Sequence, residues 1–405
     1  MFRIMLSTSP PSEILSPPPP GEPELEVSVV MPCLNEASTL EGCIRQAKEA
    51  MEKAELRGEV VIGDNGSEDG SQEMAIRCGA RVVEVSRRGY GYAIMAAAAQ
   101  ARGKFIVVGD SDGTYDFTHI PRFIEKLLEG FDMVIGNRFQ GGIAPGAMPA
   151  LHRYLGNPLL SGIGRLFFKS PCHDFHCGLR AFHRERFLEL DIKTRGMEFA
   201  SEMIVKATIQ GLRITEVPTT LSQGSPSRVP HLRTWRDGWR HLRFLLVYSP
   251  KWLFLYPGVI LLSLGLGIMV WLLPGPRTVG QVRFDVHTLL YGAAMVLIAF
   301  QSILFSILSG VFAVTSGLLP KSSRMERCLD GPVLESGLLI GLGLCMGGFL
   351  ASLAALGGWG LRSFGTLDYE RMLRLVIPAV SSVILGSQLI LAAFFLSLLN
   401  LKREK

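Results

Sequence analysis

The segment 104–116, KFIVVGDSDGTYD, decides the fold, because it joins a buried strand to a pair of carboxylates. Its residues 105–108 form a short apolar run with β-branched side chains, which is typical of a buried parallel strand. The run ends at Gly109, and Asp110 and Asp112 follow in the next loop. Ligands of open α/β sheets bind at the carboxyl ends of the strands, so these two side chains mark a candidate site.

The carboxylates of Asp110 and Asp112 would repel each other unless a cation joined them. A hard divalent ion such as Mg²⁺ or Mn²⁺ takes one or two carboxylates together with phosphate oxygens. The pair therefore predicts a metal site, with both residues as ligands, that binds a diphosphate. Taken alone, the motif is more typical of a solvated Asp-Ser-Asp turn, and the metal site is favoured only together with the other motifs of the chain.

Composition divides the 405 residues into four parts. Residues 1–23 are rich in Pro and Ser and predict a disordered leader. Residues 24–230 have the mixed composition of an α/β domain, and 231–252 predict an amphipathic helix beside a membrane. A helix needs about 20 mostly apolar residues to cross a bilayer, and residues 253–405 contain four apolar segments of about that length or more. These expected spans are about 253–273, 289–314, 334–357 and 373–399.

Basic residues cluster at three places along the chain: before the first span, between the second and third spans, and at the C-terminus. They are Arg228, Arg233, Arg236, Arg240, Arg243 and Lys251; Lys321, Arg324 and Arg327; and Lys402, Arg403 and Lys405. The positive-inside rule places all three groups on the cytoplasmic side. We therefore expect a multi-pass protein of the cell (inner) membrane whose N-terminal domain is cytoplasmic.

The seven cysteines are odd in number and spread over both parts of the chain, which argues against a disulfide framework. The segment 172–177, CHDFHC, has the composition of a metal cluster. Zinc sites usually add a second pair of ligands elsewhere, and the sequence shows no such pair. Zinc is therefore disfavoured.

Strand and helix patterns alternate through the N-terminal domain, which predicts a doubly wound parallel sheet. Expected strands cover 27–31, 59–63, 81–85, 104–108, 133–135, 177–182 and 213–217, and expected helices cover 37–53, 92–101, 118–129, 154–169 and 197–210. The loops after the first three strands are polar. Asn35 and Glu36 follow the first, the segment 64–70 suits a ribose or base, and Arg87 and Arg88 lie in a glycine-rich turn that suits a phosphate. Polar turns that merely cap helices are the alternative.

An amphipathic helix is expected at 232–247, just before the first span. Trp235 and Trp239 share one side, and a stripe of arginines lies beside them. This pattern favours the headgroup layer of a membrane, although packing against the sheet domain is the alternative. The amphipathic helix at 154–169 is equally compatible with either position.

Six motifs occur in the order found in family 2 glycosyltransferases. They are VVMPCLNE (29–36), GDNGSEDGS (63–71), DSD (110–112), GNRF (136–139), DFHCGLRAF (174–182) and EVP (216–218). Over about 27–250 the chain resembles polyprenyl-phosphate glycosyltransferases of the dolichol-phosphate-mannose and dolichol-phosphate-glucose synthase type. The resemblance implies an α/β GT-A fold, a doubly wound and mostly parallel sheet, here followed by an all-α membrane domain of four transmembrane helices.

The resemblance also implies an activity: inverting transfer of a hexose from a nucleotide sugar, UDP- or GDP-linked, to an undecaprenyl or dolichyl phosphate, with Mg²⁺ or Mn²⁺. The donor would contact Pro32, Asn35, Glu36, Asp64, Gly66 and Arg88, and the catalytic residues would be Asp110, Asp112, Arg138 and Arg180. Arg228 and Arg233 are expected to bind the acceptor phosphate at the membrane. We expect no nucleic-acid partner, and a homo-oligomer is an open alternative.

Two positions depart from the family pattern, namely Asn65, where a second Asp is common, and the segment 113–116, where many members carry a Gln-containing stretch. Nucleoside contacts and sugar preference therefore do not carry over. A processive polysaccharide synthase is one alternative, but the segment 233–236, RTWR, does not match its QxxRW motif and four spans are few for a channel. A non-catalytic membrane scaffold is another, against which the intact Asp110 and Asp112 pair argues.

Overall fold

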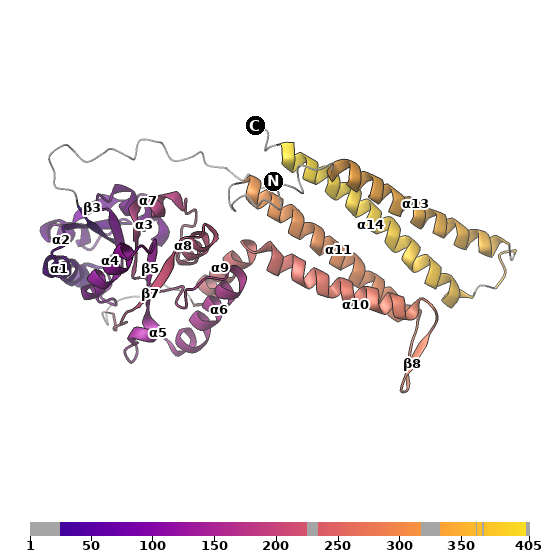
Figure 1. The fold of residues 1–405 in the computed structure, drawn as a ribbon. Coiled ribbons are helices and arrows are strands. Elements are labelled where there is room, and N and C mark those ends of the chain that lie inside the picture. The colour runs from indigo at the N-terminus through magenta and orange to yellow at the C-terminus, as the bar shows by residue number, and fades with distance from the viewer. Residues whose placement is uncertain (1–24, 225–233, 317–332, 362, 367, 402–405) are drawn as a thin grey trace. The chain divides into compact units, whose positions relative to one another are not determined.

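The computed structural model describes residues 25–224, 234–316, 333–361, 363–366 and 368–401 (Figure 1). The chain forms two compact units, Met1–Leu245 and Leu246–Lys405. The expected leader at 1–23, the two arginines Arg228 and Arg233, and the basic groups at 321–327 and 402–405 lie outside the described residues.

The first unit is built on a seven-stranded sheet whose order is β3-β2-β1-β4-β6-β5-β7. Its strands are β1 (Val27–Cys33), β2 (Gly58–Asp64), β3 (Arg81–Glu84), β4 (Phe105–Val108), β5 (Met133–Asn137), β6 (Arg180–His183) and β7 (Ile214–Pro218). Neighbouring strands are parallel except that β6 runs antiparallel to β4 and β5. The mostly parallel sheet of the GT-A fold is thus confirmed.

One strand begins later than its sequence pattern indicates. The pattern predicts a strand over 177–182, whereas β6 starts at Arg180. Residues 177–179 instead belong to a loop, because Arg180 already pairs with Val108, the last residue of β4, and β4 offers no further residue for pairing. In this loop Gly178 lies so close to Asp110 that a Cβ there would be 2.5 Å from the carboxylate Oδ2.

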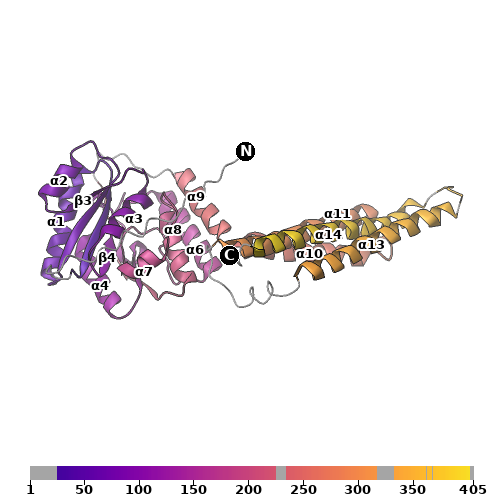
Figure 2. The same cartoon turned by 90° about the horizontal axis from the view of Figure 1, so that it is seen from above.

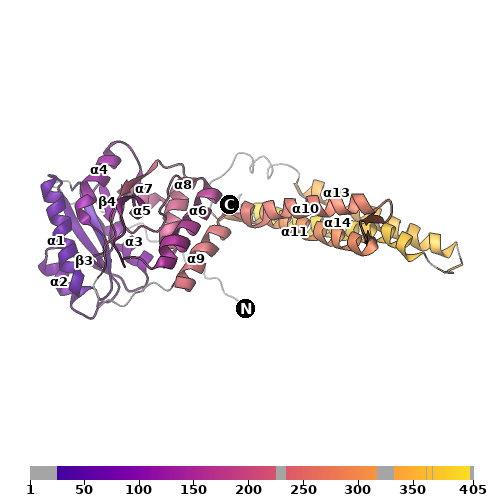
Figure 3. The same cartoon turned by 90° about the horizontal axis from the view of Figure 1, so that it is seen from below.

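Nine α-helices begin among the described residues of the first unit. They are α1 (Ala37–Lys53), α2 (Ser71–Arg77), α3 (Tyr90–Gln100), α4 (Ile120–Leu128), α5 (Arg138–Gly141), α6 (Asn157–Phe168), α7 (Arg184–Glu189), α8 (Phe199–Ile209) and α9 (Thr234–Val247). Figures 2 and 3 show α1 and α2 at one side of this unit and α6, α8 and α9 together at the other. A π-helical turn, His152–Gly156, leads into α6.

The second unit consists of long apolar helices. They are α10 (Tyr256–Leu272), α11 (Val286–Thr315), α13 (Val333–Gly360) and α14 (Tyr369–Leu401), with a short hairpin of β8 (Arg277–Val279) and β9 (Val282–Phe284) between α10 and α11. Four segments are long and apolar enough to cross a membrane: Lys251–Leu272, Val286–Thr315, Leu334–Gly360 and Tyr369–Leu399. The four expected membrane helices are therefore present.

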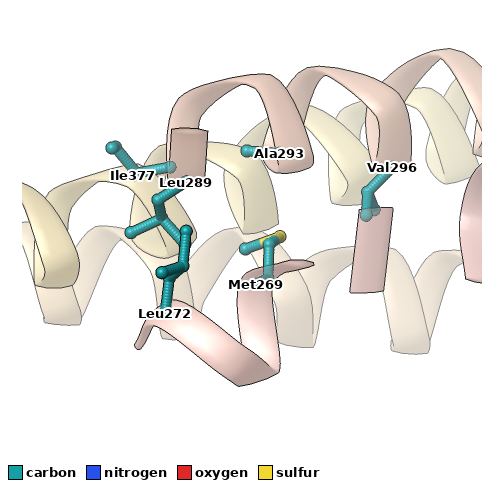
Figure 4. Packing of buried hydrophobic residues seen from close by; sticks show 6 residues of the cluster. All are labelled: Met269, Leu272, Leu289, Ala293, Val296 and Ile377. Carbon is teal, nitrogen blue, oxygen red and sulfur yellow. The ribbon is translucent and has the colours of Figure 1, made fainter. Parts of the chain in front are cut away.

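These helices pack as two neighbouring pairs, α10 with α11 and α13 with α14, and α11 also contacts α14 (Figure 1). Small residues permit the close approach: a Cβ at Gly265 would lie 2.7 Å from the carbonyl oxygen of Gly292. Where α10, α11 and α14 meet, their side chains form an apolar cluster (Figure 4). It contains Met269, Leu272, Leu289, Ala293, Val296 and Ile377.

Candidate active site

Three polar loops meet at the carboxyl ends of the neighbouring strands β1, β2 and β4. The backbone N–H of Asn35 donates to Ser67 Oγ at 2.9 Å, and Asn35 Oδ1 accepts from the N–H of Glu68 at 2.9 Å. Ser111 Oγ donates to the carbonyl of Pro32 at 2.7 Å. The loops that the sequence places at one edge of the sheet are thus hydrogen-bonded into one surface.

Asp64 shapes the turn after β2. Its buried carboxylate accepts the N–H groups of Gly66 and Ser67 at 2.9 and 3.0 Å and the side-chain amide of Gln72 at 2.6 Å. Glu36, the residue before α1, is also buried. Both acidic residues are therefore enclosed at the strand ends.

Asn65, one of the two departures from the family pattern, holds the loop after β3 against the carboxyl end of β2. Its amide Nδ2 donates to the carbonyls of Val85 at 3.4 Å and Arg87 at 3.1 Å, and its Oδ1 accepts from the N–H of Gly89 at 3.0 Å. An ionised Asp could not donate to either carbonyl. The amide therefore fixes the turn that presents Arg88, whose side chain is exposed.

The two carboxylates after β4 are each held by a hydroxyl group. Asp110 Oδ1 accepts from the Tyr90 hydroxyl at 2.8 Å, and Asp112 Oδ1 accepts from the N–H and hydroxyl of Thr114 at 3.0 and 2.5 Å. Burial, and after it the nearby Asp110, raises the pKa of Tyr90 well above its usual value. The phenol therefore stays protonated and acts as a donor to Asp110.

The donor set at Asp110 and Asp112 fits Mg²⁺ or Mn²⁺, because such ions use one or two carboxylates and complete their shell with water and substrate phosphates. Within the described ranges, no group of three or more His, Cys, Asp or Glu side chains is placed to hold a metal ion. This holds for the segment 172–177 as well, where Cys172 Sγ and His173 Nδ1 are instead hydrogen-bonded to Glu216. A metal at the aspartates would therefore depend on the phosphates of a bound donor.

The two arginines expected near the donor phosphates are buried and bind a loop, residues 174–178. Arg138 forms a bidentate pair with Asp174, with both N–O distances 2.7 Å. Arg180 donates to the carbonyls of Phe175 at 2.6 Å and Cys177 at 2.7 Å. The structure thus assigns both side chains a part in fixing this loop, and a contact of either with the donor stays a prediction.

The loop 174–178 rests directly on the aspartate site. Gly178 packs against the Asp110 carboxylate so closely that no Cβ would fit there. Its N–H donates to the Tyr115 hydroxyl at 2.7 Å. Tyr115 comes from the segment that departs from the family pattern. Any shift of this loop would therefore move the surroundings of Asp110.

An apolar cavity of about 410 Å³ opens beside Asp110. Its walls are formed largely by the segment 151–160, which includes the start of α6, and by α9. Prominent wall residues are Leu155, Leu159, Leu160, Trp235, Trp239 and Leu242. The two tryptophans are 82% and 60% exposed, so the α9 wall continues onto an open apolar surface.

Three histidines also line this cavity: His152, His176 and His241. His241 Nδ1 lies 2.8 Å from Ser201 Oγ, and burial lowers the pKa of His241 to about 4. Burial, and after it the neighbouring His241, lowers the pKa of His176 well below its usual value. Both imidazoles are therefore neutral at neutral pH.

Sequence reasoning missed four residues of this site: Tyr90, Asp174, His176 and His241. Asp174 and His176 belong to the motif DFHCGLRAF (174–182), and Tyr90 lies in the glycine-rich turn 87–92. Their positions in the motifs give no indication of burial or of partners far away in the chain. Arg228 and Arg233, the expected acceptor-binding residues, lie outside the described residues.

Comparison with known proteins identifies the class. Residues 28–190 match the family model for glycosyl transferase family 2, and 307–400 match that for the glycosyltransferase family 2 C-terminal transmembrane region. The low-salt glycan biosynthesis hexosyltransferase Agl6 of Haloferax volcanii is 36% identical over 382 residues, which cover 92% of this chain and 89% of that protein. The chain belongs to glycosyltransferase family 2 and is a membrane glycosyltransferase.

Two further similarities each cover part of the chain. A dolichyl-phosphate hexose transferase of Haloferax volcanii is 33% identical over 162 residues, which are 40% of this chain and 69% of that protein. The crystal structure of glucosyl-3-phosphoglycerate synthase from Mycobacterium tuberculosis with Mn²⁺, UDP and glucosyl-3-phosphoglycerate has 22% identity and a TM-score of 0.43. That match covers 55% of this chain and 78% of the synthase.

Proposed function

We propose that the protein transfers a hexose from a UDP- or GDP-sugar to the phosphate of a polyprenyl lipid, undecaprenyl or dolichyl. The observation that carries the proposal is the apolar cavity that begins at Asp110 and is walled by leucines and tryptophans. A lipid phosphate could place its charged head beside the aspartates and its first isoprene units against this wall. The names of the two Haloferax volcanii relatives, a hexosyltransferase and a dolichyl-phosphate hexose transferase, support the same reaction class.

The donor would bind at the strand ends of β1, β2 and β4. Pro32, Asn35, Glu36, Asp64 and Gly66 lie on or under that surface. Arg88, beside the N-terminus of α3, would contact a phosphate. Asp110 and Asp112 would hold Mg²⁺ or Mn²⁺, which when bound would neutralise the charge that develops on the leaving nucleoside diphosphate.

The acceptor phosphate is ionised at neutral pH and needs positioning more than a general base. In a single displacement, a phosphate oxygen forms a bond to the anomeric carbon while the bond to the donor's diphosphate breaks, which inverts that carbon. The protein's contribution is a rigid frame, in which Tyr90 orients Asp110 and Thr114 orients Asp112. Arg138 and Arg180 would act as positioning residues for the adjoining loop.

The helices that wall the cavity also suit a membrane surface. On α6, Leu159 and Leu166 are more than half exposed, and on α9 the exposed Trp235 and Trp239 lie beside Arg236 and Arg240. Apolar and basic side chains in this arrangement favour the headgroup layer. We propose that the sheet domain lies on the cytoplasmic face of the cell (inner) membrane and takes its acceptor from the lipid.

The proposed reaction is tested with purified protein, a panel of nucleotide sugars and a polyprenyl phosphate, with and without a chelator. We expect a lipid-linked sugar only when donor and lipid phosphate are both present. Chelation should abolish the product, and Mg²⁺ or Mn²⁺ should restore it. Equal transfer to a water-soluble acceptor would refute the lipid acceptor, long polysaccharide would indicate the processive synthase, and no turnover of any donor would favour the scaffold.

The proposed topology predicts which cysteines can be labelled. Thr278 in the β8–β9 hairpin is exposed, and with four spans and a cytoplasmic sheet domain this hairpin lies outside the cytoplasm. A Thr278→Cys variant should therefore react with an impermeant thiol reagent in intact cells. As the control, Glu68→Cys on the exposed β2–α2 loop should react only after permeabilisation. If Glu68→Cys reacted in intact cells and Thr278→Cys only after permeabilisation, the proposed topology would be wrong.

A further inference from the structure

The two imidazole nitrogens of His176 are buried without a hydrogen bond. Neither Nδ1 nor Nε2 has a partner among the described residues, and both atoms are inaccessible to solvent. A buried polar group left unsatisfied is costly, so native proteins rarely retain one without a ligand, an ordered water or a functional reason. The two nitrogens of His176 therefore point to a partner that the protein chain itself does not supply.

The backbone around His176 is fixed on both sides. Arg180 donates to the carbonyls of Phe175 and Cys177, the residues immediately before and after it, and the N–H of Phe175 donates to Ser161 Oγ at 3.2 Å. The ring meets that of His241 edge to face, with 4.5 Å between centroids. A terminal imidazole torsion is soft, so the ring can turn a nitrogen toward the cavity while the backbone stays in place.

The surroundings indicate what the missing partner is. His176 lines the apolar cavity and lies two residues before Gly178, which rests on Asp110. A phosphate monoester at the inner end of this cavity would be an anion with several acceptor oxygens, in a cavity whose walls are mostly apolar and include the carboxylate residues Asp110 and Asp237. A neutral imidazole supplies one N–H donor, and a hydrogen bond to a charged acceptor is stronger than one between neutral groups.

We infer that His176 donates a hydrogen bond to the phosphate of the lipid acceptor and so positions the attacking oxygen beside Asp110. The inference rests on the proposed function and adds a residue to it. His176 is thereby a determinant of acceptor binding that acts on the phosphate, whereas the leucines and tryptophans of the wall act on the chain.

The test compares His176→Phe, which keeps the ring and removes both nitrogens, with His176→Gln, which keeps an N–H donor. We expect His176→Phe to raise the KM for polyprenyl phosphate about tenfold or more, as for loss of a charge-assisted hydrogen bond, with the KM for the nucleotide sugar unchanged. His176→Gln should recover most of the loss. The melting temperature of His176→Phe should not fall, because no internal hydrogen bond is broken.

Two controls separate the possible causes. His183→Phe makes the same substitution in a ring that packs on Phe105, 4.9 Å between centroids and off the cavity, and should leave the lipid KM unchanged. Citronellyl phosphate, a short-chain acceptor, should show the same relative loss in His176→Phe as the long lipid does. A loss confined to the long lipid would overturn the inference, because His176 would then contact the chain.

The outcomes distinguish this inference from the proposed function. If the wild-type protein makes no lipid-linked product, the proposed function fails. If the wild type makes the product and His176→Phe has the wild-type lipid KM, only the role of His176 fails. A lower melting temperature in both His176 variants would show that the ring has a structural partner, which also overturns the inference.

Discussion

Asp112→Asn should reduce transfer by about a hundredfold or more while the protein remains folded. The substitution keeps the size of the side chain and an oxygen that can accept from Thr114, whose N–H and hydroxyl hold Asp112 Oδ1. It removes the negative charge that would bind the divalent ion, and with it the stabilisation of the leaving diphosphate. The measurements are kcat/KM for lipid-linked product and the affinity for Mn²⁺ in the presence of the nucleotide.

The matched control is Asp116→Asn in the same segment. The Asp116 carboxylate accepts from Thr118 at the start of the helical turn Phe117–His119 and from Gln46 of α1. The amide oxygen introduced at position 116 can still accept both hydrogen bonds, so the substitution removes only the charge and should leave stability and transfer nearly intact. Wild-type activity in Asp112→Asn, or an equal loss of activity in Asp116→Asn, would contradict a special role for the aspartate pair.

Arg138→Met should lower the free energy of unfolding by about 3–5 kcal/mol. The carboxylate of Asp174 is 0% exposed and is held by Nε and Nη2 of Arg138, so the substitution leaves a buried charge without its counterion. The loop 174–178 would then lose its anchor beside Asp110, and transfer should fall with stability. Thermal and denaturant unfolding of the purified protein measure the first effect, and product formation measures the second.

The double variant Arg138→Met/Asp174→Asn separates the two roles that Arg138 could have. The neutral amide introduced at position 174 needs no counterion, and its oxygen can still accept the backbone N–H of position 138, which donates to Asp174 at 3.1 Å in the native protein. If Arg138 only positions the loop, stability and activity should recover together. Recovery of stability without activity would support the contact with the donor phosphates, and full stability of the single variant would refute the ion pair.

The sequence alone determined the elements of this protein and the location of its carboxylate pair. Apolar runs and helical spacing are local properties, so α1 has the expected bounds Ala37–Lys53 and β4 ends just before the loop that carries Asp110. The four membrane helices follow from length and apolar composition in the same way. The carboxyl ends of parallel strands lie at one edge of a sheet. The sequence alone therefore predicts that the loops after β1, β2 and β4 lie close together.

Only the tertiary structure decided how distant residues pair. The antiparallel direction of β6 depends on its neighbours β4 and β5, and no local pattern encodes it. The ion pair of Arg138 with Asp174 joins residues of separate loops. The hydrogen bond of the Asn65 amide to the carbonyl of Arg87 does the same. The two nitrogens of His176 are enclosed for the same reason, because α9 contributes His241 and the cavity wall from a distant part of the chain. Which residues are buried, and which hydrogen-bond or ionic partners they have, depends on the packing of the whole chain. A motif in the sequence therefore does not by itself specify the geometry of the site.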